Sequence, residues 1–110
     1  ITTINIDENN SGKILPEKIG VKLRDVYPNP FNSSTVIEFD SKTIRDVKMD
    51  LYAITGSKIR SLYSGRPTSG SHRISWDGRD SLGSEVSSGI YLVVLNDGLS
   101  VQTKRIALIR

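Results

Sequence analysis

The sequence contains no cysteine and only one histidine, His72. Disulfide bonds, thiolate chemistry and cysteine-ligated metal sites are therefore excluded. A catalytic triad or a histidine metal site would need partners for His72 that this composition does not supply. His72 stands in phase with Ile74 and Trp76 in an alternating run, which favours a structural position in or along the core.

Long hydrophobic runs are also missing. The longest, Ile90 to Leu95, is far shorter than the roughly 20 residues of a membrane-spanning helix, so we expect no membrane insertion. No secretory leader opens the chain, and because it starts at Ile1 without a methionine we expect a fragment of a longer polypeptide. The net charge of +3 comes from scattered lysines and arginines. Nucleic-acid binding needs a basic face, so we expect no nucleic-acid partner.

The motifs of common catalytic sites are absent as well. The abundant serines lie in turns, and none sits in a Gly-x-Ser-x-Gly elbow between a strand and a helix. The sequence has no phosphate-binding loop, no heptad repeat and no amphipathic helix. We therefore predict a non-catalytic domain with no catalytic residues, no cofactor and no metal site.

One acidic loop keeps a metal hypothesis open. Asp77, Asp80 and Glu85 would offer oxygen ligands to calcium, although their spacing does not match an EF-hand loop. The alternative, which we favour, is a turn in which Asp77 and Asp80 accept backbone hydrogen bonds. Calorimetric titration with calcium would separate the two.

The first part of the chain differs from the rest. Ile4 and Ile6 alternate with polar residues, as at the end of a strand of an upstream domain, and the polar stretch Asp7–Lys13 has the composition of a linker. A length of 110 residues is typical of one domain. We predict a linker over residues 1–21 and one folded domain over residues 22–110.

From residue 21 onward the hydrophobic period is two, which indicates β-strands. Glycine-containing turns separate short strands about every 8–12 residues, as in an antiparallel sandwich or barrel. Ile59 and Leu62 are three apart, which requires a bulge or a change of face. Asn96-Asp97-Gly98 predicts a hairpin. The alternating core candidates are Ile37, Phe39, Val47, Met49, Leu51, His72, Ile74, Trp76, Tyr91, Val93, Leu95, Ile106 and Leu108.

One strand is apolar on both faces. Ile90, Leu92 and Val94 alternate with the core candidates of the run 90–95. Such a run is typical of a strand covered on both sides. Either an extra segment covers the outer face, for which the proline-rich stretch before residue 33 is a candidate, or a patch is open to a partner. The covered arrangement is the simpler interpretation.

The segment Tyr27-Pro28-Asn29-Pro30-Phe31-Asn32 precedes a predicted strand. Its two prolines fix φ, remove two backbone donors and push the residues before them toward extended conformations. We expect an ordered lead-in that packs Tyr27 and Phe31 against the core while Asn32 starts a turn.

These residues closely resemble a known family. Leu23–Asn32 followed by Ser34–Phe39 resembles the opening of the C-terminal sorting domain of the type IX (Por) secretion system, which is similar to the immunoglobulin-like domain of flagellar hook-capping proteins. The resemblance covers about Leu15–Arg110, including the terminal Lys104–Arg110; departures occur at Ser33, Ala53 and Val94. The motif residues are Tyr27, Pro28, Asn29, Pro30, Phe31, Asn32, Gly56, Gly70, His72, Trp76, Asp77, Gly78, Gly89 and Tyr91.

The resemblance implies a fold and a function. The fold would be all-β, an immunoglobulin/fibronectin-III-like antiparallel β-sandwich of about seven strands. The function would be a sorting and anchoring module of a protein that is exported through the periplasm and secreted or held at the bacterial cell surface. Its partners would be the type IX secretion machinery and the upstream domain. Recognition would use the last strand and its exposed edge, with Lys104, Arg105, Ile106 and Leu108 as candidates.

The motif residues also have a purely structural interpretation. We expect Trp76 to be the largest core side chain, Gly89 to allow a backbone geometry that a Cβ would obstruct, and Tyr91 to donate its hydroxyl to a turn carbonyl.

Two other functions remain in view. The domain would stabilise an adjacent catalytic domain, such as a hydrolase, as an accessory module. It would alternatively bind carbohydrate through exposed aromatic residues, for which Tyr52 and Tyr63 are the best candidates.

Overall fold

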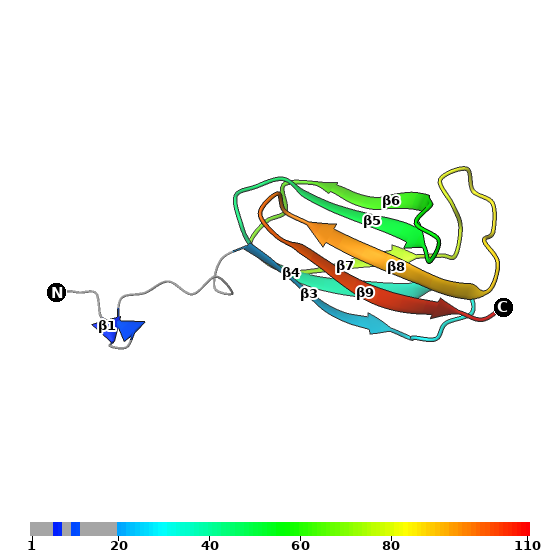
Figure 1. Ribbon diagram of the computed structural model, residues 1–110, viewed down its shortest axis with the longest axis horizontal. Coiled ribbons are helices and arrows are strands. Elements are labelled where there is room, and N and C mark those ends of the chain that lie inside the picture. The colour runs from blue at the N-terminus through cyan, green and yellow to red at the C-terminus, as the bar shows by residue number, and fades with distance from the viewer. Residues whose placement is uncertain (1–5, 8–9, 12–19) are drawn as a thin grey trace.

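The computed structural model describes residues 6–7, 10–11 and 20–110 (Figure 1). The short strands β1 (Ile6–Asp7) and β2 (Asn10–Ser11) pair with each other in antiparallel orientation. The expected linker, residues 1–21, lies largely outside the described residues and stays a prediction, as does the expected strand containing Ile4.

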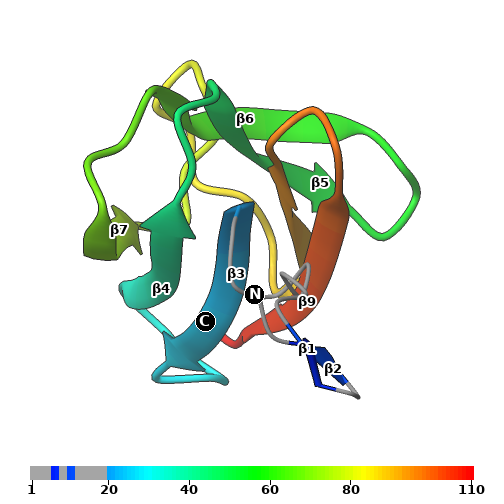
Figure 2. The same cartoon turned by 90° about the vertical axis from the view of Figure 1, so that its left-hand side faces the viewer.

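Seven strands form a sandwich of two antiparallel sheets. One sheet has the order β3-β4-β7 and the other β6-β5-β8-β9, and the end-on view separates the two layers (Figure 2). No helix occurs within the described ranges. The all-β, immunoglobulin-like prediction is confirmed. The strands are β3 (Gly20–Tyr27), β4 (Thr35–Lys42), β5 (Val47–Ala53), β6 (Lys58–Gly65), β7 (Gly70–Trp76), β8 (Gly89–Asn96) and β9 (Val101–Leu108).

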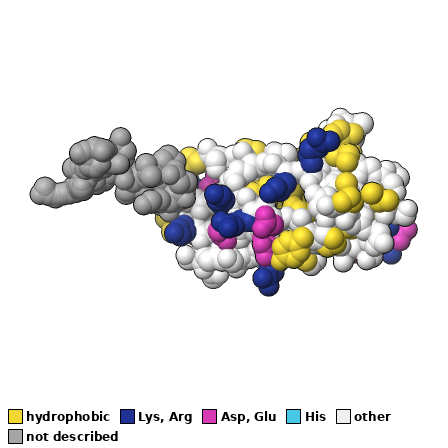
Figure 3. Space-filling view, turned by 90° about the horizontal axis from the view of Figure 1, so that it is seen from below, with side chains coloured by type: hydrophobic (Ala, Val, Ile, Leu, Met, Phe, Trp, Pro, Cys, Tyr) yellow, Lys and Arg dark blue, Asp and Glu magenta, His cyan; other side chains and the backbone are white. Residues whose placement is uncertain are grey.

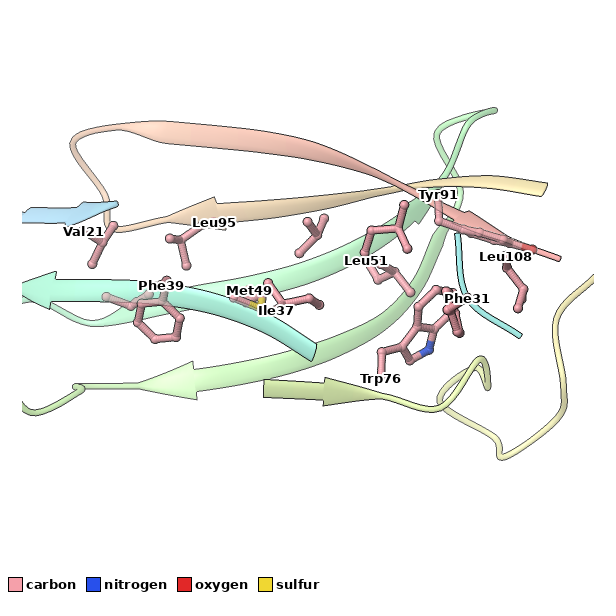
Figure 4. Close-up of a cluster of buried hydrophobic side chains, with 13 residues drawn as sticks. Val21, Phe31, Ile37, Phe39, Met49, Leu51, Trp76, Tyr91, Leu95 and Leu108 are labelled. Atoms are coloured by element: carbon pink, nitrogen blue, oxygen red, sulfur yellow. The ribbon is translucent and has the colours of Figure 1, made fainter. Parts of the chain in front are cut away.

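The core is made by the alternating residues of both sheets. Ile59 and Leu62 of β6 pack against it, and the pairing of β6 with β5 is irregular at two places, so the predicted bulge near these residues is confirmed. Figure 4 shows the buried cluster between the layers. It consists of Val21, Phe31, Ile37, Phe39, Val47, Met49, Leu51, Trp76, Tyr91, Val93, Leu95, Ile106 and Leu108.

Trp76 is fully buried at one end of this cluster. Its ring centroid lies 5.3 Å from that of Phe31 and 5.3 Å from that of Tyr91. The indole Nε1 donates a hydrogen bond of 2.9 Å to the carbonyl of Arg79. The indole is therefore both packed and satisfied in its one polar atom, as a buried tryptophan requires, and the predicted position of Trp76 is confirmed.

The predicted hairpin joins β8 to β9 and is held by Asp97, which is 4% exposed. Its Oδ1 accepts from the backbone N–H groups of Leu99 and Ser100 at 2.9 and 2.8 Å. Burial favours the neutral form and pushes the pKa of Asp97 up. The hydrogen bonds donated by Leu99 and Ser100 outweigh this effect, so the pKa of Asp97 is lowered overall.

We expect Asp97→Asn to cost about 1 kcal/mol of unfolding free energy at neutral pH, because the charged acceptor is lost. A lowered folded-state pKa stabilises above the unfolded pKa, about 4, and that stabilisation disappears as the pH falls through the lower folded value. Urea unfolding at pH 7 and in steps below pH 4 would show the gap closing. Exposed Asp25→Asn is the control, and a pH-independent gap would contradict this role.

Candidate recognition surface

The proline-rich segment pairs with the end of the last strand. Phe31 forms a parallel bridge with Leu108. The N–H of Phe31 donates to the carbonyl of Ala107 at 3.0 Å, and the N–H of Ile109 donates to the carbonyl of Phe31 at 2.8 Å. Phe31 is only 3% exposed, so its ring enters the core at the same point. The expected packing of Phe31 is confirmed.

Asn29 extends this pairing with its side chain. Its Nδ2 donates to the carbonyl of Arg105 at 3.0 Å, and its Oδ1 accepts from the N–H of Ala107 at 2.9 Å. The two peptide bonds before Pro28 and Pro30 are cis. Because one amide group supplies both a donor and an acceptor, Asn29 continues the ladder where the neighbouring prolines offer no N–H.

Tyr27 does not pack against the core, and this part of the expectation is wrong. It is 42% exposed and pairs with Val36 at the end of β3, so its ring lies on the outer face of the sheet. Its hydroxyl donates to Oε2 of Glu38 at 2.6 Å. The reason is phase: β3 has a register irregularity between Leu23 and Val26, which changes the alternation before Tyr27.

Glu38 is the centre of a polar cluster on this outer face. It accepts from Tyr27 and from the Nε of Arg73, the latter at 3.1 Å. The hydrogen bond from Tyr27, followed by that from Arg73, lowers the pKa of Glu38, and the bond to Glu38 raises the pKa of Tyr27. Tyr27 and Arg73 are exposed and Glu38 is half-buried, so this cluster orders the face more than it stabilises the fold.

The candidate recognition residues of β9 divide into two classes. Ile106 and Leu108 are 0% and 1% exposed and belong to the core. Arg105 and Lys104 are exposed, and the Nζ of Lys104 donates to the carbonyl of Arg24 on β3. Of the four candidates, only Lys104 and Arg105 have side chains that a partner of the folded domain could contact. Their role in recognition stays a prediction.

The edge of β9 is less open than the sequence suggested. Asn29 and Phe31 occupy its backbone groups from Arg105 to Ile109. Further along the strand, the side chain of Gln102 accepts from the N–H of Leu23 at 2.8 Å and donates to the carbonyl of Val21 at 2.7 Å. Side chains therefore close the side of the sandwich between β3 and β9. An asparagine between two prolines was the sequence signal for this closure.

Charges on this side are mixed. Figure 3 shows lysine and arginine side chains interspersed with aspartate and glutamate, without a continuous basic patch on the face that it displays. Arg24, for example, lies 3.2 Å from Asp40. The expectation of a scattered basic excess agrees with this face.

The loop 77–88 follows the turn interpretation. Asp77 accepts from the N–H of Arg79, and Asp80 accepts from the N–H groups of Leu82 and Ser84. Within the described residues, no three His, Cys, Asp or Glu side chains gather as a metal site would require. Calorimetric titration with calcium is the direct test of the alternative.

Arg110, the last residue of the chain, holds this loop in place. This contact was not predicted from the sequence. The guanidinium of Arg110 donates to the carbonyls of Val86 and Gly78, each at 2.6 Å, and its backbone N–H donates to Oγ of Ser88. Gly78 has φ +75°, and a Cβ there would lie 2.8 Å from the guanidinium. The motif glycine is thus required by its left-handed conformation, and a Cβ there would also displace the end of the Arg110 side chain.

The other motif residues make contacts within the fold or lie at turns and strand ends. The hydroxyl of Tyr91 donates to the carbonyl of Ser87, as predicted. His72 is half-buried, stacks on Phe39 at 5.1 Å between ring centroids, and donates from Nε2 to the carbonyl of Thr68. Gly56 lies in the turn after β5, and Gly70 begins β7.

The prediction for Gly89 is wrong. Its φ is not in the left-handed region, and a Cβ there would meet only Tyr91, at 4.0 Å. That separation is an ordinary contact, so a small side chain would fit. Position in the motif was not evidence of a steric requirement.

The aromatic residues proposed for carbohydrate binding are not the most exposed ones. Tyr52 and Tyr63 are half-buried, and the ring of Tyr63 lies 5.8 Å from that of Phe39 at the core. Tyr27, at 42% exposed, is more open to solvent than either of them. The choice of Tyr52 and Tyr63 is therefore corrected, because an irregular β6 turns Tyr63 inward.

The proline-rich segment does not cover the outer face of β8. It pairs with β9 instead, and Ile90, Leu92 and Val94 remain half-exposed beside Tyr52 and Arg105. A separate recess of about 440 Å³ lies next to Gly20, at the end of the sandwich away from Trp76. Its apolar members include Ile44 and Leu99, which are 84% and 73% exposed.

Comparisons with known proteins identify the family. The sequence profile described as the secretion system C-terminal sorting domain matches residues 25–109. The chain belongs to this family. The matched range contains the pairing of residues 29–31 with β9, Trp76 and the loop held by Arg110. The resemblance inferred from the motifs is confirmed, and this sorting domain is part of a secreted or cell-surface bacterial protein.

Solved structures similar to this sorting domain include two proteins of Porphyromonas gingivalis. Dimeric latent PorU is 20% identical with a TM-score of 0.63, and the match covers 81% of this chain and 9% of PorU. PorZ, an essential surface component of the type-IX secretion system, is 26% identical with a TM-score of 0.52 and is matched over 11% of its length and 80% of this chain. No curated protein matches the sorting domain. The PorU likeness supports the fold alone.

The described part of the sorting domain contains no helix that could cross a membrane. This chain spans only about a tenth of PorU and of PorZ.

Proposed function

We propose that the chain is a non-catalytic sorting and anchoring module, recognised as a folded domain by the type IX secretion machinery. The observation that carries this proposal is the family match over residues 25–109, which contains the end of β3 and all of the strands from β4 to β9. The upstream domain of the same polypeptide is the cargo, and the residues before β3 (Gly20–Tyr27) are the linker to it.

The distribution of reactive side chains supports a non-catalytic role. His72 is engaged by Phe39 and Thr68, so its imidazole faces no acid or nucleophile in the contacts that the structure gives it. The carboxylates of Asp77 and Asp80 are used by turns. A catalytic site needs a nucleophile or acid aligned with a base.

The exposed surface offers several recognition elements. Lys104 and Arg105 are exposed on β9, whereas Ile106 and Leu108 would act by holding that strand in place. We propose that the cations contact the machinery directly. Lys104 already binds the carbonyl of Arg24, so its replacement also loosens the closure between β3 and β9.

The runner-up function is an accessory domain that stabilises a neighbouring catalytic domain. The half-exposed apolar face of Ile90, Leu92 and Val94 favours it, because such a face would suit a packed neighbour.

Deletion of residues 22–110 from the full-length parent separates the two functions. The sorting role predicts that the parent keeps its activity and melting temperature and is no longer secreted. The accessory role predicts lost activity or a lowered melting temperature with secretion unchanged. Substitution of the unrelated exposed Lys48 by glutamine is the matched control and should alter none of these readouts.

A further inference from the structure

A sandwich of two open sheets has four edge strands, here β3, β7, β6 and β9. An unpaired edge presents a row of backbone donors and acceptors, and proteins usually protect such rows. On β9, Asn29 and Phe31 occupy the edge. On β3, the side chains of Gln102 and Lys104 occupy it, and the strand is bulged.

The edge of β6 is also protected. Its pairing with β5 has two irregularities, and bulges disrupt the regular row of backbone groups that an added strand would need. In addition, the carbonyl of Ile59 accepts from the N–H of Ser81 in the loop 77–88.

The fourth edge, β7, has none of these protections. It pairs with β4 through seven consecutive residue pairs without an irregularity. Every second residue of such a strand points its N–H and C=O away from the partner strand. Across residues 20–110 no hydrogen bond reaches the backbone of residues 70–76 from the outer side. Figure 2 shows β7 at the margin of the molecule, with no strand beyond it.

We propose that the edge of β7 accepts an extended segment of another polypeptide, which adds as a fourth strand to the sheet β3-β4-β7. The main-chain hydrogen bonds of strand addition supply affinity, and alternate side chains supply specificity.

The side chains of β7 define the chemistry of that segment. Arg73 points to the outer face, is 72% exposed, and is paired with Glu38 on the side of β4. Its other side faces the position of the added strand, where a carboxylate would continue the alternation of charges across the sheet. Ile74 and His72 lie on the inner phase and are half-buried, so they favour an apolar neighbour. The segment therefore alternates acidic with apolar residues.

The same residue argues against a second copy as the occupant. Arg73 is the middle residue of Gly70–Trp76. Antiparallel pairing of two β7 edges about a two-fold axis through this position would place two arginines opposite each other, and like charges directly opposite destabilise a strand pair. A different, acidic polypeptide avoids that contact.

The test is a titration of the full chain with a peptide of about nine residues, within the usual range of strand lengths, that alternates valine with glutamate. Amide NMR and hydrogen exchange would report the binding site. We expect the outward amides of β7 to become protected and those of β9 to remain unchanged. A twin peptide methylated at alternate backbone nitrogens keeps the side chains and lacks the donors, so it should not bind.

Two variants test the charge. Arg73→Gln should weaken the peptide up to about fivefold, the range of a cross-strand charge pair, whereas exposed Arg45→Gln should leave affinity unchanged. Protection at β6 or β9, equal binding of the methylated twin, self-association through β7, or no change in any β7 amide at millimolar peptide would each overturn the proposal. Peptide binding at β7 and the sorting role can fail separately, because the first is read by amide NMR and the second by secretion of the parent.

Discussion

Replacement of Trp76 by alanine is expected to lower the free energy of unfolding by about 3–5 kcal/mol. The side chain is fully buried, and its ring contacts Phe31 and Tyr91 at centroid distances of 5.3 Å. Its removal leaves a cavity where the two sheets and the proline-rich segment meet. It also leaves the carbonyl of Arg79 without its indole donor.

Urea unfolding measures this loss as a shift of the midpoint at constant slope. A total stability of 5–15 kcal/mol is usual for a domain, so the variant would retain only a marginal fold. Trp76→Phe keeps most of the apolar volume and should lose less. Exposed Ser75→Ala, one residue away, is the matched control. A loss below about 1 kcal/mol for Trp76→Ala would show that the indole is not central to the core.

Phe31→Ala is expected to cost about 3 kcal/mol, since Phe31 is a buried aromatic residue. The loss should be localised, because the backbone of Phe31 is also bonded to Ala107 and Ile109. We expect faster hydrogen exchange at the amides of residue 31 and Ile109, which donate in these two bonds, than the global loss of stability accounts for. The edge of β9 would then be opened.

Amide exchange read residue by residue would test this second effect. Exposed Asn32→Ala lies next to Phe31 in the same segment and should change neither stability nor exchange by a measurable amount. Uniform acceleration of all core amides by Phe31→Ala, in proportion to the change in global stability, would contradict a specific role in closing the edge.

Regular alternation made most of the fold predictable. Positions such as Ile37, Phe39 and Met49 lie in strands where buried apolar residues recur at every second position, so sequence phase and burial agree. Tyr27 and Tyr63 were placed wrongly because each follows a register irregularity. A bulge reverses the phase of all later residues. The spacing of Ile59 and Leu62 marked the irregularity in β6, whereas nothing in the sequence of β3 marked the one before Tyr27.

The closure of the sandwich was harder to predict because it depends on contacts between distant residues. Asn29 and Ala107, or Arg110 and Gly78, are brought together only by the folded topology. Asn29 was singled out as a motif residue, but single-residue chemistry does not specify which backbone its amide binds. Ile106 and Leu108 were core candidates by their phase and recognition candidates by the resemblance, and the structure places both in the core.

The central claim is that the folded sandwich is itself the export address. Residues 15–110 should therefore be fused behind a periplasmically targeted fluorescent protein in a bacterium with a type IX system, and the fluorescence outside the cells measured. The account predicts that the fusion reaches the surface or the medium and that less of the Trp76→Ala fusion, whose fold is only marginally stable, leaves the cell. Retention of the folded fusion in the periplasm would contradict it.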